Sequence, residues 1–271
     1  MSVVPEGTGP GTFDRGADSW ARWRETPWGR MRYLLVAHTL ATALESLGPG
    51  CRVLDIGGGD GADSLPLAAL GHQVTILDGA PTLLRRARER AAAEGLAGSV
   101  RVVCADLEEA APAGPDGAAG SGYDLVLCHN VVQYTADVGA TVDLVARSAR
   151  VGGVVSVLAP NPAMDVLAAA VRRSDPSAAL AVLGTATVRS ETFGHDMRRV
   201  ERGTVEDALL RSGCSLTHRF GLRCVTDLVA DDERKHDADF FEELYRLEVA
   251  LCDREEFRNT ARFWQVLAVR G

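Results

Sequence analysis

The sequence predicts an α/β fold with a doubly wound, mostly parallel seven-stranded sheet. Three observations lead to this prediction. Five short strands, apolar throughout, alternate with helices between residues 52 and 158, which is typical of a parallel sheet covered on both faces. The first strand runs directly into a glycine-rich turn. Two further strands are expected after an insertion between strands five and six.

The composition is that of a globular protein. The 271 residues are 46% hydrophobic, enough for one large domain or one domain with a cap. No run approaches the roughly 18 apolar residues of a membrane helix, and the N-terminus lacks the segments of a secretory signal. Six scattered cysteines without a C-x-x-C pair predict reduced thiols and no metal site. We expect a cytoplasmic protein without membrane association.

The charge balance narrows the range of partners. The net charge of −8 argues against strong nonspecific binding to nucleic acid. Arginine supplies nearly all the positive charge, and Lys235 is the only lysine. The acidic balance therefore favours a small-molecule partner.

The N-terminal region is predicted to be helical after a short lead. Residues 1–12 are rich in glycine and proline and are expected to be disordered. Residues 13–47 are expected to form a helical cap of two helices, 13–24 and 28–47, separated at Thr26-Pro27.

The aromatic and basic residues of this cap have two interpretations. Its tryptophans either anchor the arm on the domain, or the arm covers a cofactor. In the second interpretation Arg24, Arg30 or Arg32 binds a cofactor carboxylate, because a planar guanidinium can bind a carboxylate through two hydrogen bonds.

The run VLDIGGGDGAD, residues 53–63, is the most informative motif. It predicts a strand, a tight turn and a helix that begins near Asp63. Glycines allow positive φ and let a ligand approach bare backbone, while a helix N-terminus offers free N–H groups. The spacing fits dinucleotide-binding turns and the D-x-G-x-G-x-G form of S-adenosylmethionine (AdoMet) enzymes equally well.

Three carboxylates decide between these cofactors. Asp55 precedes the turn, Asp60 lies inside it, and Asp63 follows it. A pyrophosphate would meet several negative charges at close range in a partly dry site, which is unfavourable. AdoMet instead brings a sulfonium and an ammonium group. We therefore predict AdoMet. NAD(P) and a purely structural turn are the weaker alternatives.

The AdoMet-binding core is expected over residues 48–160. The predicted strands are 52–56, 73–77, 100–104, 123–128 and 154–158, and the predicted helices are 64–69, 81–94 and 138–149. Residues 110–122 are rich in alanine, glycine and proline and are expected to form a loop.

Polar residues follow the first four strands, and ligands bind beyond the carboxyl ends of such strands. Asp78, at the end of the second strand, suits the two ribose hydroxyls. Asp106 suits the adenine amine, with the backbone of Leu107 facing the ring. His129 and Asn130 follow the fourth strand beside the expected site of methyl transfer.

Each of these residues also has a structural interpretation. Asp78 could cap the next helix, Asp106 could be a turn residue, and His129 could make a structural hydrogen bond.

Residues 161–205 are expected to form a substrate lid, with helices at 164–173 and 178–183. Phe193, His195, Met197 and Arg198 are candidate wall residues, and a surface packing element is the alternative. The next helix is predicted over 204–212, with Thr204 as its N-cap and Gly213 as its stop.

Residues 206–271 are expected to complete the core sheet. They predict a strand at 215–220, a turn at 223–228, a helix at 237–252 and a strand at 263–269. Arg223 begins the turn. It either binds a substrate carboxylate or forms an ordinary salt bridge.

The runs VLDIGGGDGAD, ILDGA, CADLEE and DLVLCHNVVQY resemble class I AdoMet-dependent methyltransferases, and most closely the tRNA 5-carboxymethoxyuridine methyltransferase group. The similarity extends from Phe13-Asp14 to the C-terminal strand. It implies a Rossmann-like methyltransferase fold with cofactor contacts at Arg32, Gly57, Gly58, Asp78, Asp106 and His129. The sequence departs from this group at residues 130–134 and 163–183, where substrate is selected.

These arguments give three sets of candidate residues and no metal site. The cofactor set is Arg32, Asp55, Gly57, Gly58, Gly59, Asp78, Gly79, Asp106, Leu107 and His129. The catalytic candidates are His129 and His195. The substrate candidates are Arg223, Asn130 and Tyr134.

The expected function is AdoMet-dependent methylation of an oxygen or nitrogen on a small molecule. We expect a monomer or homodimer with a role in secondary metabolism. One alternative is a methyltransferase for a carboxylate on a tRNA wobble uridine. Another is an AdoMet-binding cyclase or sensor, and an NAD(P) oxidoreductase is the weakest.

Overall fold

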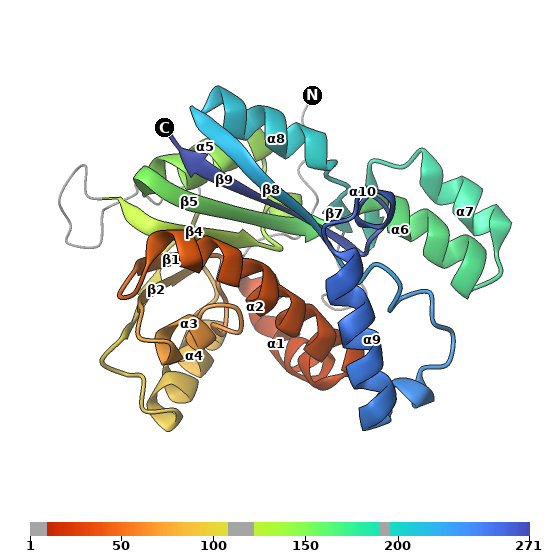
Figure 1. Ribbon diagram of the computed structural model, residues 1–271, viewed down its shortest axis with the longest axis horizontal. Helices are drawn as coiled ribbons and strands as arrows, with labels where there is room; N and C mark the ends of the chain where they lie inside the picture. The colour runs from red at the N-terminus through yellow and green to blue at the C-terminus, as the bar shows by residue number, and fades with distance from the viewer. Residues whose placement is uncertain (1–9, 108–121, 190–195) are drawn as a thin grey trace.

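The computed structural model describes residues 10–107, 122–189 and 196–271, with a central sheet and helices on both faces (Figure 1). The sheet has seven strands in the order β3-β2-β1-β4-β5-β9-β8. Pairs among the first five are parallel, and β9 runs antiparallel to β5 and β8. The predicted fold class is confirmed.

The strands agree with the predicted ranges to within a few residues, except that β5 is longer at both ends. They are β1 (Arg52–Ile56), β2 (Gln73–Asp78), β3 (Val100–Cys104), β4 (Tyr123–His129), β5 (Ala149–Pro160), β8 (Cys214–Leu222) and β9 (Phe263–Arg270). A separate pair of short strands, β6 (Thr187–Arg189) and β7 (Asp196–Arg198), was not predicted from the sequence.

Successive residues of the central strands are buried on opposite faces of the sheet. In β4, Leu125 and Leu127 belong to one core, while Val126 and Cys128 belong to the other. All four are fully buried. Because neither face meets water, both sets of positions are apolar and the strands read as continuous apolar runs.

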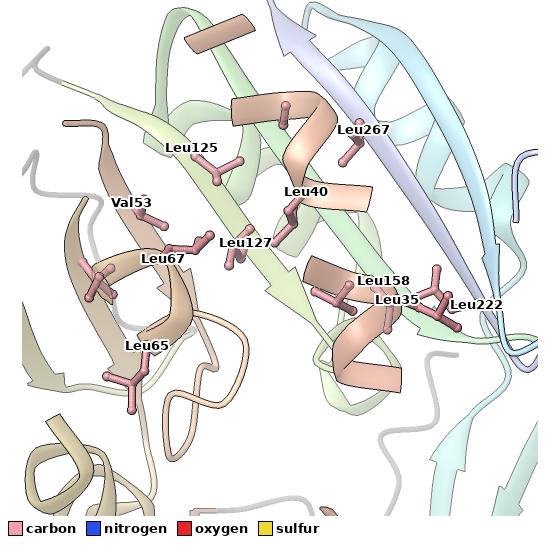
Figure 2. Packing of buried hydrophobic residues seen from close by; sticks show 14 of the residues in the cluster. Leu35, Leu40, Val53, Leu65, Leu67, Leu125, Leu127, Leu158, Leu222 and Leu267 are labelled. Atoms are coloured by element: carbon pink, nitrogen blue, oxygen red, sulfur yellow. The ribbon is translucent and has the colours of Figure 1, made fainter. Parts of the chain in front are cut away.

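One face packs against α2 (Pro27–Leu47), α3 (Leu65–Ala69), α4 (Pro81–Ala93) and α9 (Ala238–Leu251). Figure 2 shows leucines of α2 and α3, such as Leu35 and Leu67, directed toward β4 and β5. The other face packs against α5 (Val138–Ser148) and α8 (Arg202–Arg211). These layers leave the carboxyl ends of the parallel strands open to the N-terminal arm and the insertion.

The N-terminal arm consists of α1 (Pro10–Glu25) and α2, and the break between them at Thr26-Pro27 is confirmed. Thr26 caps α2 by accepting a hydrogen bond from the Gly29 N–H at 3.1 Å, and Pro27 is the first helical residue. α1 begins at Pro10, so residues 10–12 of the expected lead are helical, whereas residues 1–9 lie outside the described residues.

The insertion contains α6 (Pro162–Leu167), a π-helical turn η2 (Ala168–Arg172) and α7 (Pro176–Leu183). Both helices begin earlier than predicted because each is capped by a residue before a proline. Asn161 accepts from the Ala163 N–H at 3.1 Å, and Asp175 accepts from the Ala178 N–H at 2.8 Å.

The prediction that Thr204 caps the following helix is wrong. α8 begins at Arg202, and the Thr204 N–H already bonds to the Glu201 carbonyl inside the first turn. The stop at Gly213 is confirmed, since Gly213 adopts φ +79° after the last turn.

The remaining short elements are η1 (Val132–Tyr134), η3 (Glu233–His236) and α10 (Glu255–Arg258).

None of the helices in the described ranges combines the length and the hydrophobicity that a bilayer crossing requires.

Candidate active site

One cavity of about 990 Å³ extends from the carboxyl ends of the parallel strands to the arm and the insertion. Every predicted site residue that the structure describes lines it: Arg32, Asp55, Gly57, Gly58, Gly59, Asp78, Gly79, Asp106, Leu107, His129, Asn130, Tyr134 and Arg223. Among the expected wall residues, Met197 also lines the cavity. Arg198 is not part of the lining, and Phe193 and His195 lie outside the described residues, as does most of the loop expected at 110–122.

The glycine turn brings bare backbone to the cavity. The N–H groups of Gly57 and Gly58 bond to the Leu77 carbonyl at 2.7 and 3.3 Å, which holds the turn against β2. A Cβ at Gly57, where φ is +65°, would lie 2.4 Å from Val131. A Cβ at Gly58 would lie 2.5 Å from the Asp55 carboxyl group. Glycine is therefore required by space at both positions and by backbone conformation at Gly57.

Asp78 connects the glycine turn to the next helix. Its carboxylate accepts hydrogen bonds from the N–H groups of Gly59, at 2.9 Å, and Ala80, at 2.7 Å. Burial raises its pKa, although these hydrogen bonds act in the opposite direction. Asp106 and Leu107 follow β3 on the same side of the cavity.

Two of the three carboxylates around the turn are already paired with arginines, which corrects the charge argument made from the sequence. Asp60 forms an ion pair with Arg24, and its other partner is Arg90, whose Nη1 lies 3.3 Å from Oδ2. Asp63 forms a bidentate pair with Arg32. Among the carboxyl groups next to the turn, Asp55 and Asp78 are therefore the two without an arginine partner among the described residues.

Asp55 is the third carboxylate around the turn. It is 2% exposed, and its Oδ2 has no hydrogen-bond partner among the described residues. Burial, reinforced by the negative charge of Asp63, raises its pKa to about 8. A buried carboxylate oxygen without a partner is unfavourable, so this atom is suited to a cationic ligand group.

Of the three arginines that could reach a cofactor carboxylate, only Arg32 lines the cavity. Arg24 binds Asp60, and the Arg30 guanidinium lies 5.0 Å from the centroid of the Phe241 ring. Arg32 is 1% exposed, and both of its terminal nitrogens bind Asp63 at 2.5 and 2.8 Å. Its Nε remains without a partner among the described residues.

His129 lies inside a chain of polar side chains that crosses the apolar sheet. Its Nδ1 is 2.9 Å from Asp63 Oδ2, and its Nε2 is 2.8 Å from Ser156 Oγ. Ser156 accepts from Gln265 at 3.0 Å, and Gln265 accepts from Thr39 at 2.7 Å. The chain links four elements: β4, β5, β9 and α2.

The proton positions in this chain follow from Asp63. Burial opposes its ionisation, but the charges and hydrogen bonds of Arg32 and His129 together outweigh it and hold the pKa of Asp63 far below its ordinary value. An ionised carboxylate only accepts, so His129 Nδ1 carries the proton and Nε2 accepts from the Ser156 hydroxyl. Burial also lowers the pKa of His129. Both ring nitrogens are therefore engaged in hydrogen bonds, which agrees with the structural interpretation given for His129.

Two substrate candidates stand next to each other on η1 and the preceding turn. Asn130 has φ +58°, and its Oδ1 is buried without a hydrogen-bond partner among the described residues. The Tyr134 ring meets the ring of Phe13 edge to face at 5.2 Å. The start of α1 therefore packs against this end of the cavity.

Arg223, the third substrate candidate, forms a buried salt bridge. Its Nε and Nη2 bind Asp227 at 2.8 and 2.5 Å, and the guanidinium lies 5.5 Å from the centroid of the Phe263 ring. Arg262 also binds Asp227, at 3.2 Å. This is the salt-bridge alternative that the sequence left open, in a residue that still lines the cavity.

The turn that carries Arg223 is held by a buried carboxylate on α9. Arg223 has φ +61°, and the next three N–H groups, of Cys224, Val225 and Thr226, all donate to Glu248 at 2.6 to 3.0 Å. Glu248 is fully buried. Three convergent N–H groups form an anion-binding nest, and here the anion is a side chain of the same protein.

Charge is divided unequally along the cavity. The acidic wall, from the arm and the segments after β1, β2 and β3, contains Arg32, Asp55, Asp60, Asp63, Asp78 and Asp106. The basic wall, from the insertion and the chain after β8, contains Asp165, Arg172, Arg173, Arg189, Arg223, Asp227, Asp232, Lys235 and Arg262. In Figure 1 the segments after β1 and β2 lie left of centre, and the insertion lies at the right.

The described residues contain no group of three or more histidine, cysteine, aspartate or glutamate side chains arranged to hold a metal ion. All six cysteines are free.

Several residues of this site were missed from the sequence, and some left a signal there. Ser156 and Gln265 interrupt apolar strands, and a polar residue in a fully buried strand needs a hydrogen-bond partner. Lys235 is notable as the only lysine. Nothing local in the sequence indicates that Glu248, in an acidic helix, faces inward.

The strand order, the glycine turn and the polar residues at the strand ends define a site for a nucleoside cofactor with a cationic group.

Comparison with known proteins narrows this class. The model of a methyltransferase domain family matches residues 53–153. The tRNA 5-carboxymethoxyuridine methyltransferase of Escherichia coli K12 is 26% identical over 89% of this chain and 88% of its own.

Other relatives are also methyltransferases. A ubiquinone biosynthesis O-methyltransferase of Methylobacterium is 33% identical, over 57% of this chain and 56% of its own. The magnesium protoporphyrin IX methyltransferase of Synechocystis, solved with bound S-adenosylhomocysteine (SAH), has the same fold with a TM-score of 0.63. The superposition covers 97% of this chain and 98% of the Synechocystis chain, and the two sequences are 16% identical.

This chain is a class I AdoMet-dependent methyltransferase, and its cofactor is AdoMet. The resemblance noted from the motifs is confirmed at this level.

Proposed function

We propose that this enzyme transfers the AdoMet methyl group to an oxygen or nitrogen of a small, negatively charged metabolite. The observation that carries the proposal is the division of charge along one cavity. An acidic wall suits a cationic cofactor, and a basic wall suits an anionic acceptor.

The size of the cavity supports a small acceptor. Its volume of about 990 Å³ lies at the upper end of the range of roughly 300–1,000 Å³ that is usual for small-molecule sites. The cavity therefore has room for a nucleoside cofactor together with a second small molecule.

The basic wall supports an anionic acceptor. Six cationic and three acidic side chains are found among its described residues. Arg173 and Arg189 are exposed, and their guanidinium groups have no ion-pair or hydrogen-bond partner among the described residues. A positive surplus in a protein with a net charge of −8 is a local feature, and it attracts anions to this cavity.

The residues of the acidic wall fit the parts of AdoMet. We assign the ribose hydroxyls to Asp78, the adenine ring to Asp106 and Leu107, and the ammonium group to Asp55, whose Oδ2 has no partner. The Nε of Arg32 is the donor for the cofactor carboxylate, and Gly57 to Gly59, with Gly79, give the backbone surface. When bound, AdoMet supplies an electrophilic methyl group on its sulfonium.

The protein's own contribution to the reaction is positioning and removal of water. A carboxylate that is itself methylated already carries the attacking electron pair and needs no general base, whereas a hydroxyl or amine acceptor also releases a proton. We assign His129 to positioning because both ring nitrogens are engaged. It fixes Asp63 and through it Arg32. Asn130 lines the cavity and its Oδ1 has no partner among the described residues, so we assign it as a hydrogen-bond acceptor for the substrate. Tyr134 with Phe13 closes the cavity end.

A second candidate substrate is a carboxylate on tRNA. It is favoured by the 26% identity, over 89% of the chain, to a tRNA 5-carboxymethoxyuridine methyltransferase. The same basic wall would then receive a carboxylate carried by a nucleotide. The net charge of −8 favours the small metabolite instead.

The test uses AdoMet with a trideuterated methyl group and a cell extract separated into tRNA, anionic, cationic and neutral small-molecule fractions. We expect a labelled product in the anionic small-molecule fraction. Label in tRNA alone would replace the proposal by the second candidate, and label in the neutral or cationic fractions alone would overturn the anionic acceptor. Unlabelled products of altered structure would favour a cyclase instead.

A matched variant tests the role of charge. The double variant Arg173→Gln, Arg189→Gln is expected to raise KM for the anionic acceptor severalfold while the affinity for SAH stays unchanged. Arg85→Gln, Arg88→Gln, on α4 away from the cavity lining, is the control. Equal KM in the two double variants would remove electrostatic attraction from the proposal.

We further propose that the enzyme is cytoplasmic, acts in secondary metabolism, and is a monomer or homodimer.

A further inference from the structure

Lys235, the only lysine of the chain, is buried in the wall of the cavity. It belongs to η3 and is 2% exposed. Its Nζ donates to Asp232 Oδ1 at 2.8 Å and lies 5.9 Å from the centroid of the Trp28 ring. Trp28 comes from the start of α2. The N-terminal arm and the segment after β8 therefore meet at this point.

Asp232 serves two cations at once. Arg172, from η2 in the insertion, also binds Asp232 and donates to the Val229 carbonyl at 2.7 Å. Burial works to raise the pKa of Asp232, but the hydrogen bond and charge of Lys235 outweigh it, so the pKa is lowered. One ionised carboxylate thus faces two positive charges, and one positive charge is left without compensation.

The ammonium group also has donors to spare. A lysine Nζ has three hydrogen-bond donors, and within the described ranges Asp232 is its one hydrogen-bond acceptor. Burying an ammonium group with unused donors is unfavourable. Since Lys235, Arg172 and Trp28 all line the cavity, a ligand anion in the cavity can take these donors.

The other cations of the basic wall are less suited to this task. Arg223 is engaged in a bidentate pair with Asp227, and Arg262 is shared between Asp227 and Asp165. Arg173 and Arg189 are exposed. Trp28 is half-buried beside Lys235 and adds a flat apolar surface, on which an aromatic or conjugated ring can stack.

We propose that Lys235, Arg172 and Trp28 form a subsite that binds a carboxylate of the methyl acceptor together with the flat ring that bears it. The proposal rests on the proposed function and deepens it, because it names the acceptor class as an aryl or conjugated carboxylic acid. Lys235 donates to the carboxylate, Arg172 adds charge, and Trp28 packs against the ring.

The experiment measures binding of small probes to the full-length protein saturated with SAH, by ligand-observed NMR titration. The probes are benzoate, 4-hydroxybenzoate and indole-3-carboxylate, each compared with its own carboxamide. We expect at least one acid to bind wild-type protein about tenfold more tightly than its amide, in line with a hydrogen bond to a charged group. No preference for any acid would overturn the subsite, whatever the variants do.

Lys235→Met keeps an unbranched side chain, one atom shorter, and removes its charge. We expect it to abolish the preference for the acid, with Lys235→Arg restoring part of it and Arg172→Gln reducing it severalfold. The SAH affinity of each variant shows whether the fold is intact. If Lys235→Met binds SAH like wild type and keeps the full preference, the subsite is refuted.

Failure of this subsite can be told apart from failure of the proposed function. Label in the anionic fraction together with no acid preference refutes the subsite alone. No transfer to any anionic small molecule refutes the proposed function.

Discussion

Asp63 binds Arg32 through both carboxylate oxygens, at 2.5 and 2.8 Å, in a pair whose side chains are 10% and 2% exposed. The same carboxylate also bonds to His129. This arrangement neutralises a charge that the sequence alone placed next to the cofactor, and it fixes the arginine that faces the cavity.

Asp63→Asn is predicted to be strongly destabilising. It leaves the Arg32 guanidinium buried and unpaired, and breaking one partner of a buried pair costs about 3–5 kcal/mol. Urea unfolding followed by circular dichroism measures the loss. Asp143→Asn is the matched control, since its pair with Arg147 is exposed (46% and 57%) and contributes about 0–1 kcal/mol. Equal losses in the two variants would contradict the assignment.

His129 is predicted to be a neutral imidazole with its proton on Nδ1 at pH 7. The ionised Asp63 accepts from Nδ1, and burial lowers the pKa of His129 below its ordinary value of 6.5. Long-range ¹H–¹⁵N correlation spectra report the tautomer, with His129→Gln identifying the signal. An imidazolium at pH 7, or a proton on Nε2, would show that the network is ordered differently.

Binding of SAH, which carries the same ammonium group as AdoMet, is predicted to release a proton from Asp55. The pKa of about 8 means that Asp55 is mostly protonated at pH 7 in the free protein, and a bound ammonium favours the carboxylate. Affinity should therefore rise with pH up to about 8. Calorimetry in buffers of different ionisation enthalpy measures the released proton. Asp55→Asn should lose this release, and its persistence would assign the proton to another group.

The same group gives a predicted pH dependence of stability. The folded-state pKa of Asp55 lies above the ordinary value of 3.8, so the folded protein binds this proton more tightly than the unfolded chain does. The resulting stability is fully present below pH 3.8 and is lost as pH rises through about 8. The free energy of unfolding of wild type, measured relative to that of Asp55→Asn, should therefore decrease as the pH rises from 3.8 to about 8. A difference that does not vary with pH would contradict the shift.

Glu248→Gln is predicted to weaken acceptor binding without changing cofactor binding. The amide nitrogen cannot accept from the N–H groups of Cys224, Val225 and Thr226, so the turn carrying Arg223 loosens. We expect a stability loss of about 1–3 kcal/mol, a severalfold higher KM for the acceptor and an unchanged SAH affinity. Glu242→Gln, on the exposed side of the same helix and paired with Arg246, is the control. An unchanged KM for the acceptor in Glu248→Gln would separate the turn from substrate binding.

The sequence was sufficient to predict the sheet and the position of the cavity, and its motifs indicated the cofactor. Strand residues such as Leu125 and Val126 are both apolar because helices cover both faces, so the alternation of strands and helices is visible without coordinates. The glycine turn and Asp78 are local in sequence, and parallel strands bring their carboxyl ends to one edge. For this reason the described candidates at the ends of the parallel strands, such as Asp78 and His129, line one cavity.

Only the tertiary structure decided the state of each charged group. Asp60 and Asp63 look like free carboxylates in a motif, but their partners, Arg24 and Arg32, lie 36 and 31 residues earlier in the chain. His129 on β4 forms a hydrogen bond with Ser156 on the neighbouring strand β5. Lys235, in the C-terminal half, contacts Trp28 of the N-terminal arm. Such pairings form only when segments that are distant in the sequence pack together. Burial then determines which of the paired side chains are ionised. A local pattern of residues therefore does not predict either property.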